Sequence, residues 1–357
     1  MNRTNARLPQ LASGLFLTDG GIETTLIFHD GFDLPHFAAF DLLRNTKGRQ
    51  ALTDYYKRYL SIAIEEQLGF ILETPTWRAS VDWGEKIGYT EDDIKAVNED
   101  AVYLMRQLAE ENRNSIDPLV ISGCIGPRGD GYDAGDKLTV EAAESYHDLQ
   151  IEAFKRAGAD QVTAITMTHM NEALGIVKSA MKHDIPVAIS FTLETDGRLP
   201  SGTGLKQTLT EIDKETGCAP AYYMINCAHP THFDFILPQG EAWVERIHGI
   251  RANASCRSHK ELDEAPDLDI GNPEELGMQY RDLIKLHPQL NILGGCCGTD
   301  HRHIKSISKA CRAVARSDGN EINRIKARKA IPVKAGIKQS MSHRKRTNDF
   351  EYSISNG

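Results

Sequence analysis

Short apolar segments alternate with longer amphipathic ones through the first 317 residues. Eight of the short segments have the density of β-branched and other apolar residues that is typical of strands buried on both faces. These predicted strands are residues 15–19, 69–74, 118–124, 161–166, 186–192, 222–227, 250–254 and 290–295. Eight strands separated by helical patterns indicate an α/β protein with a parallel sheet. The number eight favours a closed (β/α)8 barrel, or TIM barrel, over a doubly wound open sheet.

Helical periodicity and capping signals mark the segments between the predicted strands. An amphipathic pattern predicts a helix over 141–157 that ends at Gly158, because glycine readily adopts the left-handed conformation of a C-terminal cap. Residues 208–211 have the Thr-x-x-Glu spacing of a capping box. Asn272 followed by Pro273 predicts a further helix start, with the asparagine as N-cap and the proline at the first helical position.

The composition is that of an ordinary globular protein, and it narrows the functional classes. The 357 residues are 40% hydrophobic and 25% charged, and no apolar run approaches the roughly 18 residues of a membrane-spanning helix. The first seven residues lack the apolar stretch of a secretory signal, and an odd number of cysteines, seven, argues against a disulfide framework. We therefore expect a cytoplasmic protein with free thiols. A net charge of −9 argues against a basic nucleic-acid binder.

Charge is distributed unevenly between two parts of the chain. Residues 318–357 carry nine Lys and Arg against four Asp and Glu, a net charge of +5, which leaves −14 for residues 1–317. Few large apolar residues occur in this terminal stretch, so we interpret it as a flexible basic tail outside the barrel. Contact with an anionic partner and stabilisation of a homo-oligomer are the alternatives.

Three cysteines lie at the ends of two predicted strands. Cys227 ends the sixth strand, and Cys296 and Cys297 end the eighth. Active sites of (β/α)8 barrels are built at the C-terminal ends of the strands, so these thiols should meet at one rim. Three thiolate ligands with a fourth, open position are the pattern of a catalytic zinc site. Buried thiols without a metal are the alternative.

Glycines surround the adjacent cysteine pair. Gly294, Gly295 and Gly298 carry no side chains that would hinder a sharp backbone turn, and we expect them to let both sulfurs reach one ion. Neighbouring cysteines are poorly suited to a relaxed mutual disulfide, because the usual Cα separation is about 4.4–6.8 Å with a near-perpendicular torsion.

Taken with other motifs, the cysteines make the chain resemble the homocysteine S-methyltransferase family over about residues 14–312. The motifs are Thr18-Asp19-Gly20-Gly21, Ser122-Gly123-Cys124-Ile125-Gly126-Pro127, Ser190-Phe191-Thr192, Asn226-Cys227 and Gly294-Gly295-Cys296-Cys297-Gly298-Thr299. This family includes betaine–homocysteine and S-methylmethionine–homocysteine methyltransferases. The resemblance implies a (β/α)8 barrel in which Cys227, Cys296 and Cys297 bind Zn²⁺ and the homocysteine sulfur takes the open position.

The implied reaction is methyl transfer from an onium donor such as S-methylmethionine or betaine to homocysteine, giving methionine. Zinc would keep the acceptor sulfur as a thiolate, and the sequence shows no separately placed general base. Trp77 and Trp83 could form an aromatic wall for the donor cation, or could pack within a long loop. Two alternatives stay open: a zinc-dependent methyltransferase for another thiol, and a non-catalytic zinc or redox-sensing barrel.

The resemblance also implies a set of substrate contacts. The Asp19 carboxylate would meet the substrate ammonium, and the N–H groups of Gly20 and Gly21 would approach its carboxylate; a simple tight turn is the alternative. Thr74 could bind substrate or support the rim. Asn226 could orient Cys227 or contact substrate.

At two positions the sequence departs from the family pattern. Relatives usually carry an acid at the end of strand four that helps to hold the homocysteine amino group, and Ile165 stands there in this chain. Glu172 and Glu194 are nearby candidates to replace it, although the spacing selects neither. Glu23 stands where a small glycine is common. A different acceptor thiol, with the zinc chemistry retained, is therefore the alternative to homocysteine.

Overall fold

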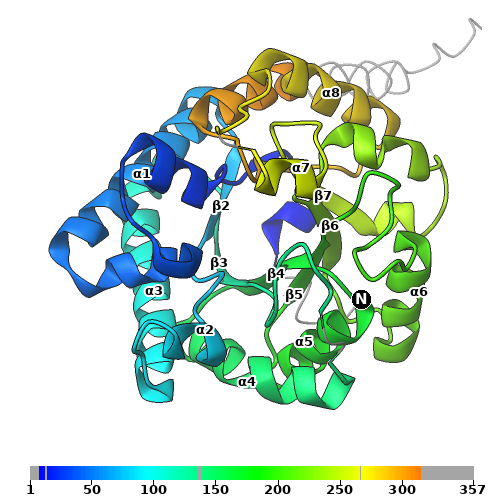
Figure 1. Cartoon of the computed structure of the whole chain (residues 1–357). Coiled ribbons are helices and arrows are strands. Elements are labelled where there is room, and N and C mark those ends of the chain that lie inside the picture. Colours follow the sequence, from blue (N-terminus) through cyan, green and yellow to red (C-terminus); the bar gives the residue numbers. More distant parts are fainter. Residues whose placement is uncertain (1–7, 13, 136–137, 266, 315–357) are drawn as a thin grey trace, which may run out of the picture. The chain divides into compact units, whose positions relative to one another are not determined.

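Eight parallel strands close a barrel in which each strand pairs with its neighbours in chain order, β1 with β8 included. The computed structural model describes residues 8–12, 14–135, 138–265 and 267–314. Figure 1 looks along the barrel, with the strands at the centre and helices around them. The strands are β1 (Phe16–Leu17), β2 (Gly69–Glu73), β3 (Leu119–Ile125), β4 (Gln161–Met167), β5 (Val187–Phe191), β6 (Tyr222–Asn226), β7 (Ile247–Ala252) and β8 (Ile292–Gly295). The predicted TIM barrel is confirmed.

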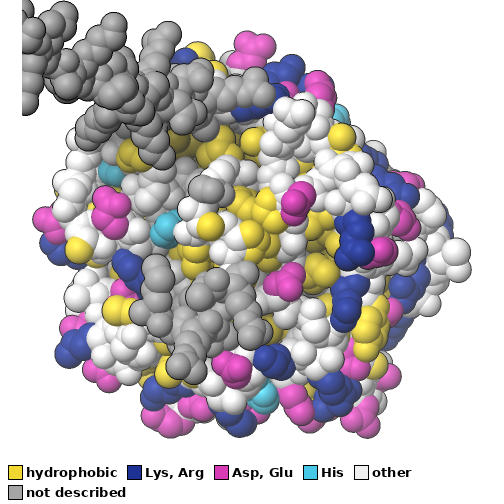
Figure 2. Space-filling model, turned by 180° about the vertical axis from the view of Figure 1, so that it is seen from behind, with side chains coloured by type: hydrophobic (Ala, Val, Ile, Leu, Met, Phe, Trp, Pro, Cys, Tyr) yellow, Lys and Arg dark blue, Asp and Glu magenta, His cyan; other side chains and the backbone are white. Residues whose placement is uncertain are grey.

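Helices follow the strands and cover the outside of the sheet. The helices are α1 (Thr46–Glu66), α2 (Val81–Glu85), α3 (Glu91–Asn112), α4 (Val140–Ala157), α5 (Met170–Lys182), α6 (Leu205–Thr216), α7 (His259–Asp263) and α8 (Pro273–Leu286). Residues 301–314 form a further helical stretch. None of the described helices is both long and apolar enough to cross a membrane. On the face in Figure 2, basic and acidic side chains interleave around the edge, and apolar side chains gather nearer the centre.

Two of the three predicted helix signals are confirmed. α4 ends at Gly158, whose φ of 83° is left-handed, and the Asn272 side chain accepts hydrogen bonds from two backbone N–H groups in the first turn of α8. The capping box over 208–211 is wrong. α6 begins earlier, after Gly204, and the Thr208 hydroxyl inside the helix donates to the Gly204 carbonyl oxygen at 3.1 Å. A threonine in a helix can satisfy its hydroxyl in this way without capping anything.

Apolar side chains fill the N-terminal end of the barrel. Besides the main core between sheet and helices, a second buried group draws residues from six strands and from the segment before β1. Its members are Leu8, Phe16, Ile71, Val120, Ala188, Ala221, Tyr222, Met224 and Ile292. Gln10, also buried, donates to Gln161 at the start of β4. This end is closed, so a ligand must enter at the C-terminal ends of the strands. The predicted basic tail, residues 318–357, lies outside the described residues.

Candidate active site

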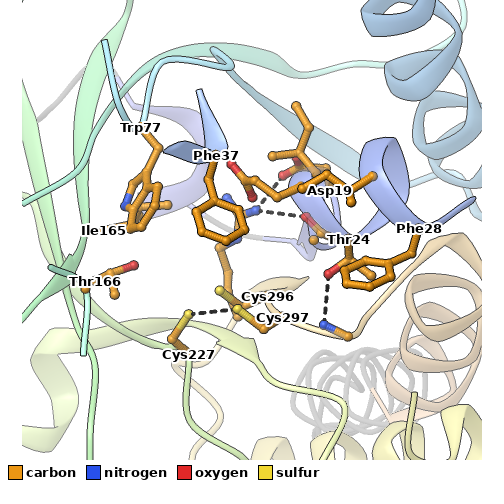
Figure 3. A pocket seen from close by; sticks show the side chains of 18 of the residues that line it. Asp19, Thr24, Phe28, Phe37, Trp77, Ile165, Thr166, Cys227, Cys296 and Cys297 are labelled. Atoms are coloured by element: carbon orange, nitrogen blue, oxygen red, sulfur yellow. Dashed lines mark hydrogen bonds and ion pairs between the residues drawn. The ribbon is translucent and has the colours of Figure 1, made fainter. Parts of the chain in front are cut away.

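The thiols of Cys227, Cys296 and Cys297 converge at the C-terminal rim of the barrel (Figure 3). The three sulfur atoms lie within 4.8 Å of one another, and the Cys227 and Cys297 sulfurs are 3.6 Å apart. Cys227 follows β6, and the other two follow β8. Residues separated by about 70 positions in the sequence therefore meet at one point, as the sequence predicts.

Backbone conformation aims these cysteines at one another. Cys227 has a left-handed φ of 51°, and its N–H donates to the carbonyl oxygen of Arg251 on β7. Gly298, with a φ of 76°, makes the turn after the cysteine pair. Gly294 has a different role from the predicted turn, because a Cβ there would collide with the Thr18 hydroxyl on the neighbouring chain segment. This glycine allows close packing at the end of β8.

The geometry of the cluster fits a metal ion better than a disulfide. Thiolates about 2.3 Å from one tetrahedral zinc ion lie about 3.8 Å apart, close to the observed 3.6 Å, whereas a disulfide needs about 2.05 Å. Hydrogen bonds from Cys227 and Cys297, assisted by the Arg251 guanidinium, lower the pKa of the Cys296 thiol well below its ordinary value. The cluster thus offers a ready thiolate and two further thiols to a thiophilic metal.

Two polar side chains support the sulfurs. The Tyr132 hydroxyl lies 2.9 Å from the Cys297 sulfur, and its ring stacks on His259 with centroids 4.3 Å apart. The Asn226 amide nitrogen lies 3.9 Å from the Cys296 sulfur, while its oxygen accepts hydrogen bonds from the Thr166 N–H and the Ser190 hydroxyl. Asn226 thus contacts Cys296, and it does not line the adjoining cavity.

A cavity of about 450 Å³ opens in front of the three sulfurs. Seven of the eight predicted metal and substrate residues line it: Asp19, Gly20, Gly21, Thr74, Cys227, Cys296 and Cys297. Gly21 donates its N–H to the Thr299 carbonyl oxygen at 3.1 Å. The Thr74 hydroxyl accepts from the Cys124 N–H at 2.9 Å and lies 2.6 Å from the Thr76 hydroxyl, which corresponds to the rim-supporting alternative.

A buried arginine lies at the inner end of the cavity, and its ion pairs connect the ends of three strands. Arg251, on β7, lies 2.6 Å from an oxygen of Asp19 after β1 and 2.6 Å from an oxygen of Glu73 on β2. The other Asp19 oxygen accepts a hydrogen bond from the Tyr55 hydroxyl at 2.8 Å. Each Asp19 oxygen therefore accepts from a group of the protein itself, and Asp19 also lines the cavity; its contact with a substrate ammonium stays a prediction.

Within the described part of the chain, no acid reaches the cavity from the end of β4. Ile165 lines the cavity at that place. Glu172 is buried against His147, at 3.0 Å, and Glu194 lies 3.3 Å from His259, and neither lines the cavity. Glu23 does line the cavity and is half-buried. Desolvation, followed by the negative charge of nearby groups, raises the pKa of Glu23 to about 7.

The two tryptophans that could form an aromatic wall for the donor cation already hold a cation of the protein itself. The Arg78 guanidinium lies between the rings of Trp77 and Trp83, 3.9 Å and 3.8 Å from their centroids. Lys86 covers Trp83 as well, at 3.6 Å. Trp77 lines the cavity, but Trp83 does not. The aromatic side chains at the mouth are instead Phe28 and Phe37, which are 59% and 54% exposed.

Sequence reasoning missed Arg251 and Tyr132. Arginine within a short predicted strand was a usable signal, because a buried arginine needs carboxylate partners. Tyr132 lies in the loop after β3, where no local pattern indicates that its hydroxyl reaches Cys297 after β8.

A thiol cluster at the C-terminal rim of a barrel is typical of an enzyme active site. Comparison with known proteins identifies the class of protein. The sequence profile of the family described as homocysteine S-methyltransferase matches residues 16–311. The chain belongs to this family of methyltransferase enzymes.

Individual relatives are distant. Homocysteine S-methyltransferase 1 of Brassica oleracea is 21% identical over 325 residues, 85% of this chain and 95% of the relative. Betaine–homocysteine S-methyltransferase 1 of Rattus norvegicus is 27% identical over 259 residues, 67% of this chain and 60% of the relative. The crystal structure of the homocysteine methyltransferase MmuM from Escherichia coli in its metallated form has a TM-score of 0.65 at 18% identity, covering 85% of this chain and 99% of that one. The structural likeness shows a shared fold.

Replacement of Arg251 by Met should strongly destabilise the protein, because Asp19 and Glu73 then remain as two buried carboxylates without a cation. Breaking a buried ion pair in this way costs about 3–5 kcal/mol. Urea denaturation should show this loss, whereas Arg113→Met, at an exposed helix end, should change the free energy of unfolding by less than about 0.5 kcal/mol. Equal midpoints for the two variants would contradict the assigned role.

Replacement of Glu23 by Gln should change how stability depends on pH. The ordinary pKa of this carboxyl is 4.5 and its folded-state pKa is about 7. Between these values the carboxyl is ionised in the unfolded chain while it is still mostly protonated in the folded protein. Raising the pH through this window therefore destabilises the wild type relative to E23Q. Unfolding free energies at pH 5.5 and pH 8 should show a gap in favour of E23Q that widens with pH, and a constant gap would refute this.

Proposed function

We propose that the chain is a zinc-dependent S-methyltransferase that transfers a methyl group from an onium donor to homocysteine, giving methionine. The observation that carries the proposal is the meeting of the Cys227, Cys296 and Cys297 thiols at the inner end of a cavity large enough for small substrates. Membership of the homocysteine S-methyltransferase family supplies the reaction class. The Escherichia coli relative MmuM crystallises in a metallated form, which supports a metal in a barrel of this kind.

The three cysteines would hold zinc, leaving its fourth position toward the cavity. Zinc bound there would lower the pKa of an acceptor thiol, so that the thiol releases its proton to solvent at neutral pH and the sulfur stays nucleophilic. Methyl transfer then forms one sulfur–carbon bond and breaks the bond between the methyl carbon and the onium nitrogen or sulfur. The electron pair of the broken bond stays on the leaving group, which becomes neutral.

Several side chains of the protein prepare this reaction. The Tyr132 hydroxyl, 2.9 Å from the Cys297 sulfur, can donate to it and moderate the negative charge that collects on the cysteines. Arg251 fixes the ends of β1, β2 and β7 relative to one another. The buried apolar group at the N-terminal end of the barrel closes the inner end of the cavity, which limits the access of water to the sulfurs.

The mouth of the cavity suits a cationic donor. Phe28 and Phe37 present more than half of their side chains to solvent, although large aromatic groups are usually buried. His36 and Phe37 both have left-handed backbone conformations, with φ of 53° and 60°, an uncommon arrangement for residues other than glycine. Such strain is concentrated at functional sites. We infer that these rings hold the onium group by cation–π contacts.

An amino-acid acceptor is favoured over an unrelated thiol. The curated relatives are named for action on homocysteine, and one, 21% identical, is a selenocysteine Se-methyltransferase of Brassica oleracea. All these acceptors are amino acids that carry a thiol or a selenol. A non-catalytic zinc or redox-sensing barrel would have no use for a cavity of this size in front of the sulfurs, or for aromatic rings exposed at its mouth.

Replacement of Cys296 by Ala should abolish both zinc binding and methyl transfer, because two thiolates rarely suffice for a catalytic zinc. Zinc content is measured by atomic emission, and methionine by mass spectrometry after incubation with homocysteine and either S-methylmethionine or betaine. Cys218→Ala, which changes an exposed cysteine, serves as the control and should retain both properties. An active C296A protein without metal would sink the proposal.

Replacement of Phe37 by Leu should raise the KM for the onium donor and leave the KM for homocysteine unchanged. Loss of one cation–π contact of about 0.5–2 kcal/mol corresponds to roughly a 2- to 30-fold effect. Phe235→Leu is a matched control, because Phe235 is 62% exposed and does not line the cavity. Equal donor KM values for the two variants would remove Phe37 from the donor site.

A further inference from the structure

An acceptor that carries an amino group needs a carboxylate partner, and the two buried carboxylates of the cavity are already in use. Asp19 is paired with Arg251 and accepts from Tyr55, and Glu73 is paired with the same arginine. One guanidinium thus serves both acids. An ammonium brought to either carboxylate would compete with an ion pair that joins three strands.

The other acids at the cavity are less suitable. Asp130 and Asp267 are exposed to solvent, where an ion pair contributes little to binding. Asp269 accepts hydrogen bonds from the Ser255 hydroxyl and the Gly271 N–H, and Arg257 lies 3.4 Å away.

Glu23 differs from all of these acids. It is half-buried, lines the cavity and lies just after the Gly20–Gly21 turn. Among the residues that the structure describes, no Lys, Arg or His nitrogen lies within 4.0 Å of its carboxylate, and no hydrogen bond links that carboxylate to another side chain. Arg78, the other cation at the cavity, is held between two indole rings. The Glu23 carboxylate is therefore available to a ligand.

We propose that Glu23 binds the ammonium group of an amino-thiol acceptor whose sulfur lies at the three cysteines. This inference rests on the proposed function and adds a residue that determines acceptor specificity. Because Ile165 stands at the end of β4, that strand offers no carboxylate. Glu23, in the segment after β1, supplies one instead.

Charge and distance both agree with this assignment. Asp19, Glu23 and Glu73 carry three carboxylates against the two guanidinium groups of Arg251 and Arg78, so a cationic ligand reduces an excess of negative charge. Gly21, two positions before Glu23, packs against the Cys296 backbone carbonyl, and Glu23 and Cys296 line the same cavity. An amino-thiol has its nitrogen only a few bonds from its sulfur, so one molecule can reach both groups. The bound ammonium would favour the ionised carboxylate.

The test compares two thiols that differ only in the amino group. Homocysteine and 4-sulfanylbutanoate share the thiol and the carboxylate, and only homocysteine has the ammonium. Binding of each to zinc-loaded wild type, E23Q and E85Q is measured by calorimetry. Glu85 is exposed on α2 and does not line the cavity, so E85Q controls for the loss of one negative charge.

Wild type and E85Q should prefer homocysteine, and E23Q should bind it roughly 10- to 100-fold more weakly, the range for one lost charge-assisted hydrogen bond. All three proteins should bind 4-sulfanylbutanoate equally. Unchanged homocysteine binding by E23Q, or equal weakening for both thiols, overturns the proposal. Failure of the wild type to bind homocysteine or to prefer it also overturns it, because Glu23 then recognises no amino-thiol.

Methyl transfer is assayed separately, so the two proposals can fail independently. If the protein binds homocysteine through Glu23 but no onium donor methylates it, the proposed acceptor site stands and the proposed reaction is wrong. If wild type and E23Q methylate homocysteine equally well, the proposed reaction stands and the proposed role of Glu23 is wrong. Zinc content should be the same in all three proteins, which separates an effect on the ligand from an effect on the metal.

Discussion

The ion pairs of Arg251 with Asp19 and Glu73 are the contacts on which the site most depends. A single buried guanidinium holds the ends of β1, β2 and β7 together, directly beside the strand that carries two of the cysteines. A buried charge is costly unless it is paired, and removing one partner of a buried ion pair leaves the other uncompensated, so these three residues constrain one another. The rim can hold reactive thiols in a fixed arrangement because its floor is fixed in this way.

This network also changes what Asp19 can do. A carboxylate that already accepts from Arg251 and Tyr55 is part of the scaffold, and recognition of a cationic acceptor then falls to an acid that the scaffold does not use. Glu23 is such an acid, since its half-buried side chain lines the cavity and, among the described residues, forms no ion pair within 4.0 Å. Scaffold and recognition are thus divided between two acids only four positions apart.

The sequence was sufficient to predict the parts of the structure that depend on local pattern. Apolar runs identified all eight strands. Because parallel strands end on one rim, the positions of Cys227 at the end of β6 and of Cys296 at the end of β8 were enough to predict that their sulfurs meet. The capping box over 208–211 failed because α6 begins at Leu205, before the threonine. The pairing of Arg251 joins residues more than 170 positions apart, and no local pattern reveals which carboxylates a buried arginine meets.

The buried apolar group at the N-terminal end of the barrel closes that end, and among the described residues the cavity opens at the C-terminal rim. Cys227 is 3% exposed, whereas Phe28 and Phe37 at the mouth are more than half exposed, so a molecule on the sulfurs lies deeper than one against the rings. If the acceptor sulfur binds at the cysteines and the donor at the rings, as proposed, this difference in depth favours binding of the thiol before the donor and release of the methylated thiol after the demethylated donor.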